Sequence, residues 1–455
     1  MINLIRNTLI RTSLLAMLAG TPAIKAQHQH QHTPAAAEPS ASETHEQHHH
    51  SAAASDDAGP NRSTGFLFGL GSGTSVNPAS WPMPMVMQRA AGWNLMWMGQ
   101  AFLVSTQQSG PRGGDKIYAA NWGMLAAARN VGRGSLMVRG MLSLDPLTVT
   151  GKRYPLLFQS GETANGVPIV DGQHPHYLLM ELSIHYARPM GEKAMINFYY
   201  APVGDAALGP IAFPHRASAM ELPQATLGHH WQDATHIANN VVTAGLTYGK
   251  FRVEASGFRG KEPNENRWNI DMGPIDSWSG RLTWQPGRNW VAQVSTGRLR
   301  RPETTHEDDV VRSTASVHYT RPVRGTLGWS TSLIWARNSK TIGRYSTNAV
   351  LAETVVPVTR KNLLTARAEW SQRDELFEYD HDVAHRIYDE TGKRAHNVGA
   401  YTIGYTRELG SARALQAAAG FNVTAYSLAS TLKPYYGSRP FGASVFLRFR
   451  LASGE

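Results

Sequence analysis

Two histidines near the middle of the chain have the spacing of metal ligands. They belong to the polar stretch Asp171-Gly-Gln-His-Pro-His, in which they are His174 and His176. In an extended backbone the side chains of residues i and i+2 point to the same side, and Pro175 stiffens the backbone between them. Both imidazoles could therefore bind one ligand, and neutral imidazole suits copper, zinc and nickel. Such a pair also occurs where the rings only bond the backbone.

A second polar stretch further along the chain holds more candidate ligands. If residues 224–237 form a helix, His229, Asp233 and His236 lie at i, i+4 and i+7 on one face of it and could bind one ion. Gly228 weakens that helix. We therefore predict a metal or polar-ligand site between the two stretches, with a hydrogen-bonded plug that holds no ligand as the alternative. The candidate ligands of the second stretch are His215, His229, His230, Asp233 and His236.

The N-terminal part of the mature chain is rich in histidine. Seven of the 19 histidines fall in residues 27–60, among them the run His48, His49 and His50. This part almost lacks large apolar residues, so we expect a disordered leader over residues 27–80. Clustered imidazoles could collect copper, zinc or nickel. The alternative is a solvated tail whose histidines reflect composition alone.

Methionines after the leader recur at alternating positions. Met96 and Met98 would share one face of an extended strand, and by the same alternation Met137, Met141 and Met195 would face the same interior. Thioethers are soft ligands that suit Cu(I). Methionine is also an ordinary filler of irregular apolar gaps, so packing against inserted loops would explain the same pattern.

A catalytic reading of the same region is weak. Ser218, Asp233 and His229 or His236 could be drawn as a triad, but no nucleophile-elbow motif accompanies them. The chain contains no cysteine, which removes thiol nucleophiles, thiolate metal sites and disulfides. We expect no enzymatic activity.

The residues named so far must be held in place by β-strands. From residue 93 onward, segments of about ten residues alternate between apolar and polar positions. Leu182 and Ile184, for example, fall on one side of their segment, and Ser183 and His185 fall on the other. A transmembrane barrel needs this pattern because its strands face lipid on one side and a wet lumen on the other.

The alternating segments predict an all-β fold, a transmembrane antiparallel β-barrel over residues 81–455. Short turns alternate with longer loops, and two loops, residues 145–176 and 202–238, are long enough to fold into the lumen. The sixteen predicted strands are residues 93–104, 116–127, 135–144, 177–189, 193–201, 239–249, 250–260, 276–286, 288–298, 310–320, 326–337, 345–357, 362–372, 396–408, 412–424 and 441–451.

Residues 1–26 have the features of a secretory signal peptide. A basic start precedes a short apolar core and small residues. Export and a barrel together predict the outer membrane of a Gram-negative bacterium, with the leader in the periplasm. The formal net charge of +10 suits contact with outer-membrane lipid and lipopolysaccharide, and nothing in the sequence resembles a nucleic-acid-binding module.

Three motifs carry a resemblance to a known family. They are Gly161-Glu-Thr-Ala, residues 168–176 and residues 228–237. With them, residues 70–451 resemble a family of Gram-negative outer-membrane proteins linked with copper and heavy-metal resistance. The leader and the methionine-rich stretch of residues 83–98 are similar to those of the copper-resistance protein B family, although this leader carries histidine where that family is richer in methionine. The resemblance implies a setting in metal resistance and no catalytic residues.

We therefore expect a barrel that binds or passes copper, or a similar soft or borderline ion, in metal resistance. Its expected partners are the metal ion, periplasmic metal-handling proteins and further copies of the chain in a homo-oligomer. The alternative is a general or anion-preferring porin with an incidental leader. In that case a basic lumen would set the selectivity, through Arg139, Arg281, Arg448 and Arg450.

Overall fold

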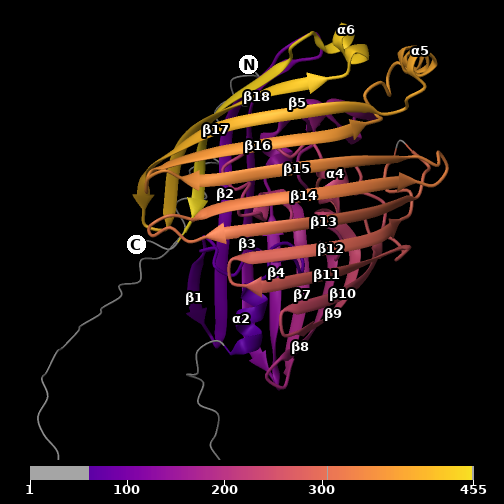
Figure 1. Cartoon of the computed structure of the whole chain (residues 1–455). Coiled ribbons are helices and arrows are strands. Elements are labelled where there is room, and N and C mark those ends of the chain that lie inside the picture. The colour runs from indigo at the N-terminus through magenta and orange to yellow at the C-terminus, as the bar shows by residue number, and fades with distance from the viewer. Residues whose placement is uncertain (1–60, 305, 453–455) are drawn as a thin grey trace, which may run out of the picture. The chain divides into compact units, whose positions relative to one another are not determined.

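A computed structural model of the chain describes residues 61–304 and 306–452. Within them, sixteen strands form a closed antiparallel β-barrel (Figure 1). The barrel strands are β2 (Trp93–Gln108), β3 (Gly114–Val131), β4 (Gly134–Leu142), β7 (Leu179–Met190), β8 (Ala194–Gly204), β9 (Ala238–Tyr248), β10 (Phe251–Arg259), β11 (Ser277–Gly287), β12 (Trp290–Leu299), β13 (Val310–Arg321), β14 (Trp329–Lys340), β15 (Ser346–Pro357), β16 (Asn362–Arg373), β17 (His396–Ala412), β18 (Leu415–Leu428) and β19 (Phe441–Leu451).

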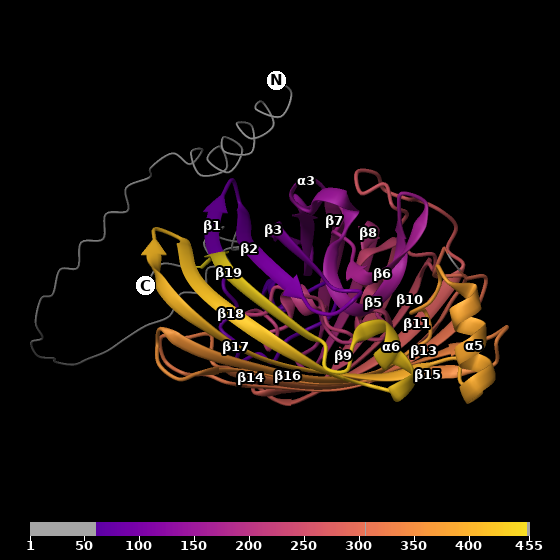
Figure 2. The ribbon, with the colours of Figure 1, turned by 90° about the horizontal axis from the view of Figure 1, so that it is seen from above.

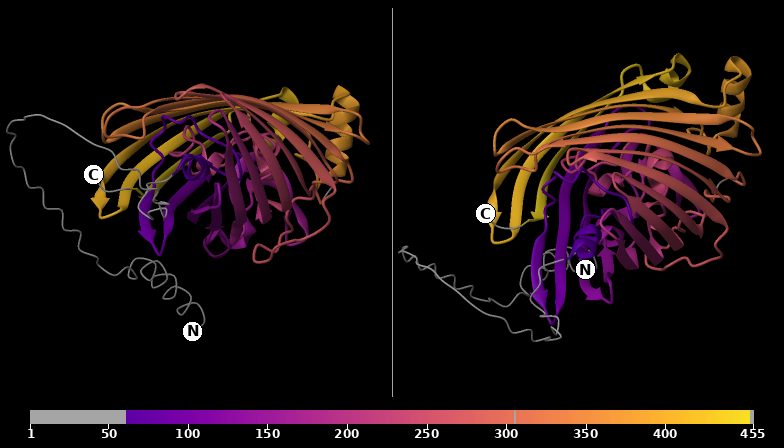
Figure 3. Two further views of the ribbon diagram at one scale, coloured as in Figure 1. Left: turned by 90° about the horizontal axis from the view of Figure 1, so that it is seen from below. Right: turned by 60° about the horizontal axis from the view of Figure 1, so that its bottom comes forward.

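Pairing between sequence neighbours builds the wall, and pairing of β19 with β2 closes it (Figure 2). β4 pairs directly with β7, because β5 (Tyr154–Ala164) and β6 (Val167–Gln173) form a separate hairpin. A short strand, β1 (Val86–Ala90), pairs with the first half of β2. In both views of Figure 3 the wall runs from the magenta strands through salmon and orange to yellow. The prediction of sixteen antiparallel strands is confirmed.

The outward face of the barrel is apolar. Large apolar side chains from many strands are exposed there while their sequence neighbours point inward, as for Leu182 and Ile184 beside buried Ser183 and His185. A solvent-exposed apolar belt of this kind is what a barrel wall in lipid requires. Further members of the belt are Leu103, Val253, Leu333 and Leu447.

None of the helices in the described part of the chain is both long and apolar enough to cross a membrane.

The second long loop fills much of the lumen. Every residue from 203 to 233 is buried. Gln100 on β2 donates a hydrogen bond to the Met220 carbonyl at 3.0 Å, and Trp231 donates to Thr347 on β15 at 2.8 Å. Because the loop leaves the wall at β8 and β15 lies seven strands further around the ring of sixteen, the loop reaches across the interior. The loop contains η2 (Phe213–His215), α4 (His229–Gln232) and η3 (Ala234–Ile237).

The first long loop also folds inward, through the β5–β6 hairpin. Leu157 and Phe158 of β5 pack with Val398 and Ala400, which lie on the lumenal side of β17. The prediction that both long loops enter the lumen is therefore confirmed. The helical turns before the hairpin are α3 (Asp145–Thr148) and η1 (Thr150–Lys152).

The segment just before the barrel is folded, and the predicted leader boundary at residue 80 is wrong for residues 61–80. Helix α2 (Arg62–Phe68) begins at Asn61, whose side chain accepts a hydrogen bond from the Thr64 backbone N–H. Its apolar face, with Leu67, is buried in the lumen. The signal peptide and residues 27–60, including His48, His49 and His50, lie outside the described residues.

The lumenal methionines pack around this helix. The five methionines predicted to face the interior do so, and all are buried in one apolar cluster with Leu67, Phe68 and Leu70. Leu67, Phe68 and Leu70 fall within the leader predicted from the sequence. Glycines at positions 65, 69, 71 and 73 leave that stretch without a clear helical spacing of apolar residues. The five methionines are Met96, Met98, Met137, Met141 and Met195.

The remaining helices lie in loops at one end of the barrel (Figure 1). They are α5 (His381–Thr391), η4 (Ser430–Leu432) and α6 (Lys433–Tyr436). We call this end, which carries the longer loops, the loop end. The opposite end carries turns as short as Gly132-Arg133 and Gly249-Lys250.

Candidate metal site between two lumenal loops

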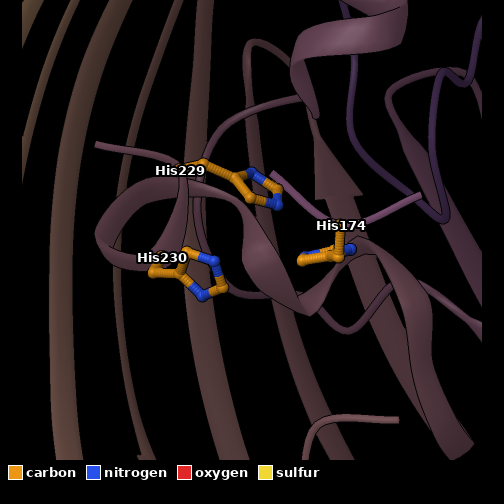
Figure 4. Close-up of side chains that lie close together, drawn as sticks. All are labelled: His174, His229 and His230. Atoms are coloured by element: carbon orange, nitrogen blue, oxygen red, sulfur yellow. The ribbon is translucent and has the colours of Figure 1, made fainter. Parts of the chain in front are cut away.

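Three histidines from the two long loops converge inside the barrel. His174 follows β6, while His229 and His230 begin α4. One ring nitrogen from each lies within 4.8 Å of those of the other two, and all three side chains are buried (Figure 4). Three imidazoles facing one space form a donor set that fits a borderline divalent metal ion.

Hydrogen bonds through Nδ1 orient two of these rings. Nδ1 of His174 bonds the Pro175 carbonyl at 3.1 Å, and Nδ1 of His229 bonds the Asp233 carboxylate at 2.7 Å. A ring that donates through Nδ1 keeps the lone pair of Nε2 for a ligand, and this arrangement accompanies most metal-binding histidines. The buried Nε2 of His174 has the Glu162 carboxylate as its neighbour, at 3.0 Å, and no further hydrogen-bond partner in the described structure.

The third ring is flanked by carboxylates. Glu262, from the loop between β10 and β11, places Oε1 3.5 Å from Nδ1 of His230, and Glu162 of β5 places Oε1 3.0 Å from Nε2 of His174. Neither ring nitrogen of His230 has a hydrogen-bond partner in the described part of the chain, although both are buried. Arg267 pairs with Glu162 and stacks on Tyr177, 4.5 Å from the ring centre.

Burial sets the protonation of the three rings. It lowers the pKa of His174 well below its usual value, with help from the positive charge of Arg267, and it lowers the pKa of His229 although Asp233 opposes this. Burial also acts to lower the pKa of His230, but Glu262 and Glu162 outweigh it and raise that pKa. His174 and His229 are thus neutral at neutral pH, as metal ligands must be.

Residues 224–237 do not form the single helix on which the i, i+4 and i+7 spacing depends. α4 ends at Gln232, and η3 begins after Asp233, whose backbone is not helical. The break occurs where the Asp233 carboxylate bonds the Phe213 backbone N–H and the Arg216 guanidinium, each at 3.0 Å. His229 and His236 still lie together, with ring centres 5.3 Å apart.

Two other predicted ligands adjoin the three-histidine site. His176 lies 5.8 Å from His236 between ring centres, and its Nδ1 bonds Asp145 at 2.9 Å. Nδ1 of His236 bonds the Asp233 carbonyl at 2.8 Å, and its buried Nε2 makes no hydrogen bond in the described structure. The two loops therefore form one continuous group of five imidazoles.

The remaining predicted ligands lie in other surroundings. His215 packs its ring against Trp122 at 4.4 Å between centres, and burial lowers its pKa to about 3. Met96 and Met98 belong to the apolar cluster around α2, so the packing alternative accounts for their position.

The catalytic arrangement considered from the sequence is not assembled. The Ser218 hydroxyl bonds Ser332 at 2.6 Å and Glu353 at 2.9 Å, while His229 and Asp233 bond one another.

Sequence reasoning missed the acidic and basic groups around the site. Glu162 lies in one of the motifs noted above, but nothing in its spacing pairs it with His174. Glu262 and Arg267 come from a loop without periodic pattern, and only the closed barrel brings that loop over the histidines. One sequence feature could have indicated this proximity. The loop follows the β9–β10 hairpin, which itself follows the second histidine-bearing loop, so the two loops emerge at the same end of the barrel.

Known structures with a similar fold are outer-membrane proteins. The anion-selective porin from Comamonas acidovorans is 13% identical, with 79% of this chain and 100% of that chain covered and a TM-score of 0.49. The Salmonella typhi OmpF complex with daunomycin is 9% identical, with 80% and 100% covered and a TM-score of 0.49. The high-pH structure of Pseudomonas putida OprB is 9% identical, with 78% and 94% covered and a TM-score of 0.48.

No protein-family model matches the chain, and no curated protein matches it at a significant level.

Proposed function

We propose that this outer-membrane barrel binds copper(II), or a similar borderline divalent ion, between its two lumenal loops and serves metal resistance. The observation that carries the proposal is the convergence of His174, His229 and His230, buried and within reach of one ion. Buried polar atoms normally have hydrogen-bond partners, so Nε2 of His230, which has none in the described structure, calls for a ligand.

The donor set favours a borderline ion over a soft one. Imidazole nitrogens and the oxygens of Glu162 and Glu262 suit Cu²⁺, Zn²⁺ or Ni²⁺, whereas Cu⁺ and Ag⁺ prefer thioethers and thiolates. The methionines that would supply thioethers pack around α2, and the chain has no cysteine. We therefore expect Cu²⁺ and Zn²⁺ to bind this site more tightly than Ag⁺.

Ion binding by variants of the full mature protein in detergent tests the proposal. Equilibrium dialysis against Cu²⁺ or Zn²⁺ should show one ion fewer per chain in His174→Asn and in His229→Asn. The exposed His385 of α5 provides the matched control, and His385→Asn should bind as the unaltered protein does. Because every protein keeps residues 27–60, ions held by the leader cancel in the comparison. Equal ion counts in all four folded proteins would refute the proposal.

The alternative is a general or anion-preferring porin, and the size of the barrel favours it. Barrels of sixteen strands commonly enclose an aqueous channel. The four arginines expected to make the lumen basic do face inward, but each pairs with a carboxylate: Arg139 with Glu181, Arg281 with Glu254, and Arg448 and Arg450 with Glu221 and Glu408.

Conductance in planar bilayers separates the two functions. The porin alternative predicts large currents with anion preference that Cu²⁺ does not change. The metal-binding proposal predicts small currents, because residues 203–233 lie buried across the lumen, and it predicts that micromolar Cu²⁺ changes them.

A further inference from the structure

A second group of potential ligands lies at the loop end of the barrel. Glu303 and His306 come from the loop between β12 and β13, and Glu375 directly follows β16. One ligand atom from each lies within 4.8 Å of those of the other two. Glu303 and Glu375 are buried, whereas the His306 side chain is 35% exposed. The group therefore opens to solvent on one side.

The second group carries more carboxylates than its cation can neutralise. The Lys340 ammonium lies 3.1 Å from Glu375, 3.0 Å from Asp374 and 4.0 Å from Glu303. Burial raises the pKa of Glu303 well above its usual value, and the charge of Glu375 adds to this rise. Three carboxylates within 4.0 Å of one ammonium group leave negative charge that a further cation could balance.

The ring of His306 turns toward this carboxylate-rich space. Its Nε2 lies 2.7 Å from Glu378 and 3.8 Å from Glu375. Two guanidinium groups close to the same carboxylates are bound elsewhere: Arg312 donates to Asn338, and Arg373 donates to Ser160 and the Leu227 carbonyl.

Three consecutive residues of β5 join the second group to the buried histidines. The Ser160 hydroxyl bonds Glu375 at 3.1 Å. Gly161 lies so close to His230 that an added Cβ would stand 2.6 Å from the ring. Glu162 then contacts His174. The two groups are therefore separated by little more than the width of one strand.

Glu262 lies between the two groups with one oxygen free. Its Oε1 faces His230, its side chain is 10% exposed, and its buried Oε2 has no hydrogen-bond partner in the described structure. Its backbone N–H also donates to the carbonyl of Pro302, the residue before Glu303, at 2.8 Å. An unpartnered buried carboxylate oxygen between two ligand sets is suited to hold a cation on its way from one to the other.

We propose that Glu303, His306 and Glu375 form a divalent-cation site at the loop end, which loads the buried histidine site by way of Glu262. The loading step rests on the metal-binding function proposed above. A row of carboxylates and imidazoles from solvent to the buried rings raises the local cation concentration and the rate of entry. The loop-end site takes oxygen-rich coordination, so it should bind Zn²⁺, Co²⁺ or Cu²⁺ more weakly than the buried site.

Cobalt provides a probe that distinguishes the two sites. Co²⁺ bound by three imidazoles in a site of low coordination number absorbs visible light strongly, and the band that disappears in His229→Asn reports the buried site. Stopped-flow absorption then measures how fast that site fills in the full mature protein.

His306→Asn is the decisive variant, because His306 is part-exposed and its loss leaves no buried charge unpaired. We expect one weakly bound ion fewer and filling of the buried site slowed roughly tenfold or more, with its equilibrium affinity unchanged. Glu378→Gln, which frees the His306 ring, should give a smaller slowing. His381→Asn, on exposed α5, is the matched control and should fill at the original rate.

The outcomes separate the two proposals. Absence of the His229-dependent band in the unaltered protein would overturn the proposed function. If the band is present but His306→Asn and Glu378→Gln keep both the filling rate and the ion count, the loop-end group only connects the loops through ion pairs and does not load the buried site.

Discussion

Asp233 connects the candidate metal-binding histidines to the ionic network of the inserted loop. Its carboxylate accepts hydrogen bonds from His229, the Phe213 backbone and Arg216. These bonds and the nearby positive charges outweigh burial and lower its pKa, so the carboxylate stays ionised. An ionised acceptor on Nδ1 fixes the His229 ring and makes its Nε2 a better ligand.

Asp233→Asn should therefore weaken Cu²⁺ binding even though it removes no ligand. We expect the dissociation constant to rise about 10- to 100-fold, as for other carboxylate partners of metal-binding histidines. Isothermal titration of folded protein in detergent measures the change, and Asp389→Asn on exposed α5 serves as control. An unchanged affinity in a folded variant would mean that Asp233 only holds the loop.

Asp205, at the start of the inserted loop, makes stability depend on pH. Burial raises its pKa to about 8, although Arg281 partly opposes the rise. The folded protein therefore keeps a proton that the unfolded chain releases above about pH 4. The proton on Asp205 therefore adds its full contribution to the free energy of unfolding below about pH 4, and this contribution declines as the pH rises toward 8.

Asp205→Asn should remove this decline. We expect a higher melting temperature than the unaltered protein at pH 8 and a smaller difference at pH 5. Thermal unfolding followed by tryptophan fluorescence at both pH values measures it. Asp389→Asn should leave the pH dependence as it was, and an equal effect of Asp205→Asn at both pH values would contradict this assignment.

At the scale of the elements, α2 packs inside the barrel against the wall of the first strands. Leu67 is 1% exposed, and it packs among the lumenal methionines of the first barrel strands. Leu67→Ala should lower the free energy of unfolding by about 2–5 kcal/mol, because the cavity cannot collapse against a rigid wall. Urea unfolding measures the loss, and Leu147→Ala, at a residue 62% exposed, should change it by less than about 0.5 kcal/mol. A loss as small as the control's would mean that α2 does not stabilise the barrel.

The wall could be predicted from sequence because each strand has two unlike faces. Ser183 and His185 alternate with Leu182 and Ile184, and that period of two survives any error in the strand ends. The inserted elements have no such signal. α2 is only seven residues long and contains Gly65, so it has no clear helical pattern in the sequence. The break at Asp233 depends on Arg216, a residue that reaches it only in the folded lumen.

The candidate site was predictable in part from histidine spacing and from the order of the hairpins. His-x-His and the His229–His236 spacing marked the two loops, and the hairpin order placed them side by side. The carboxylates that complete the site, Glu162 and Glu262, depend on tertiary contacts made after the ring closes. Spacing in sequence carries no information about such contacts.

At the scale of the whole molecule, ion pairs fasten the inserted loop to the wall. Arg216, fully buried in the loop, bonds Glu353 of β15 at 2.6 Å, and Glu353 also accepts from Arg367 at 3.0 Å and from Ser218. Four strands further along the wall, Glu221 of the loop pairs with Arg448 and Arg450 of β19. The loop is thus anchored to two separated parts of the ring, and the lumen stays obstructed while both anchors hold.

Glu353→Gln should release the first anchor and open the barrel. It leaves two buried guanidinium groups facing a neutral amide, and breaking a buried ion pair from one side costs about 3–5 kcal/mol. The loop can lower that cost by moving Arg216 into water, which unblocks part of the lumen. Single-channel recordings should therefore show larger and more frequent openings than in the unaltered protein. Glu192→Gln, at an exposed turn, should record as the unaltered protein does. Equal conductance of Glu353→Gln and the control would mean that the loop keeps its place without this ion pair.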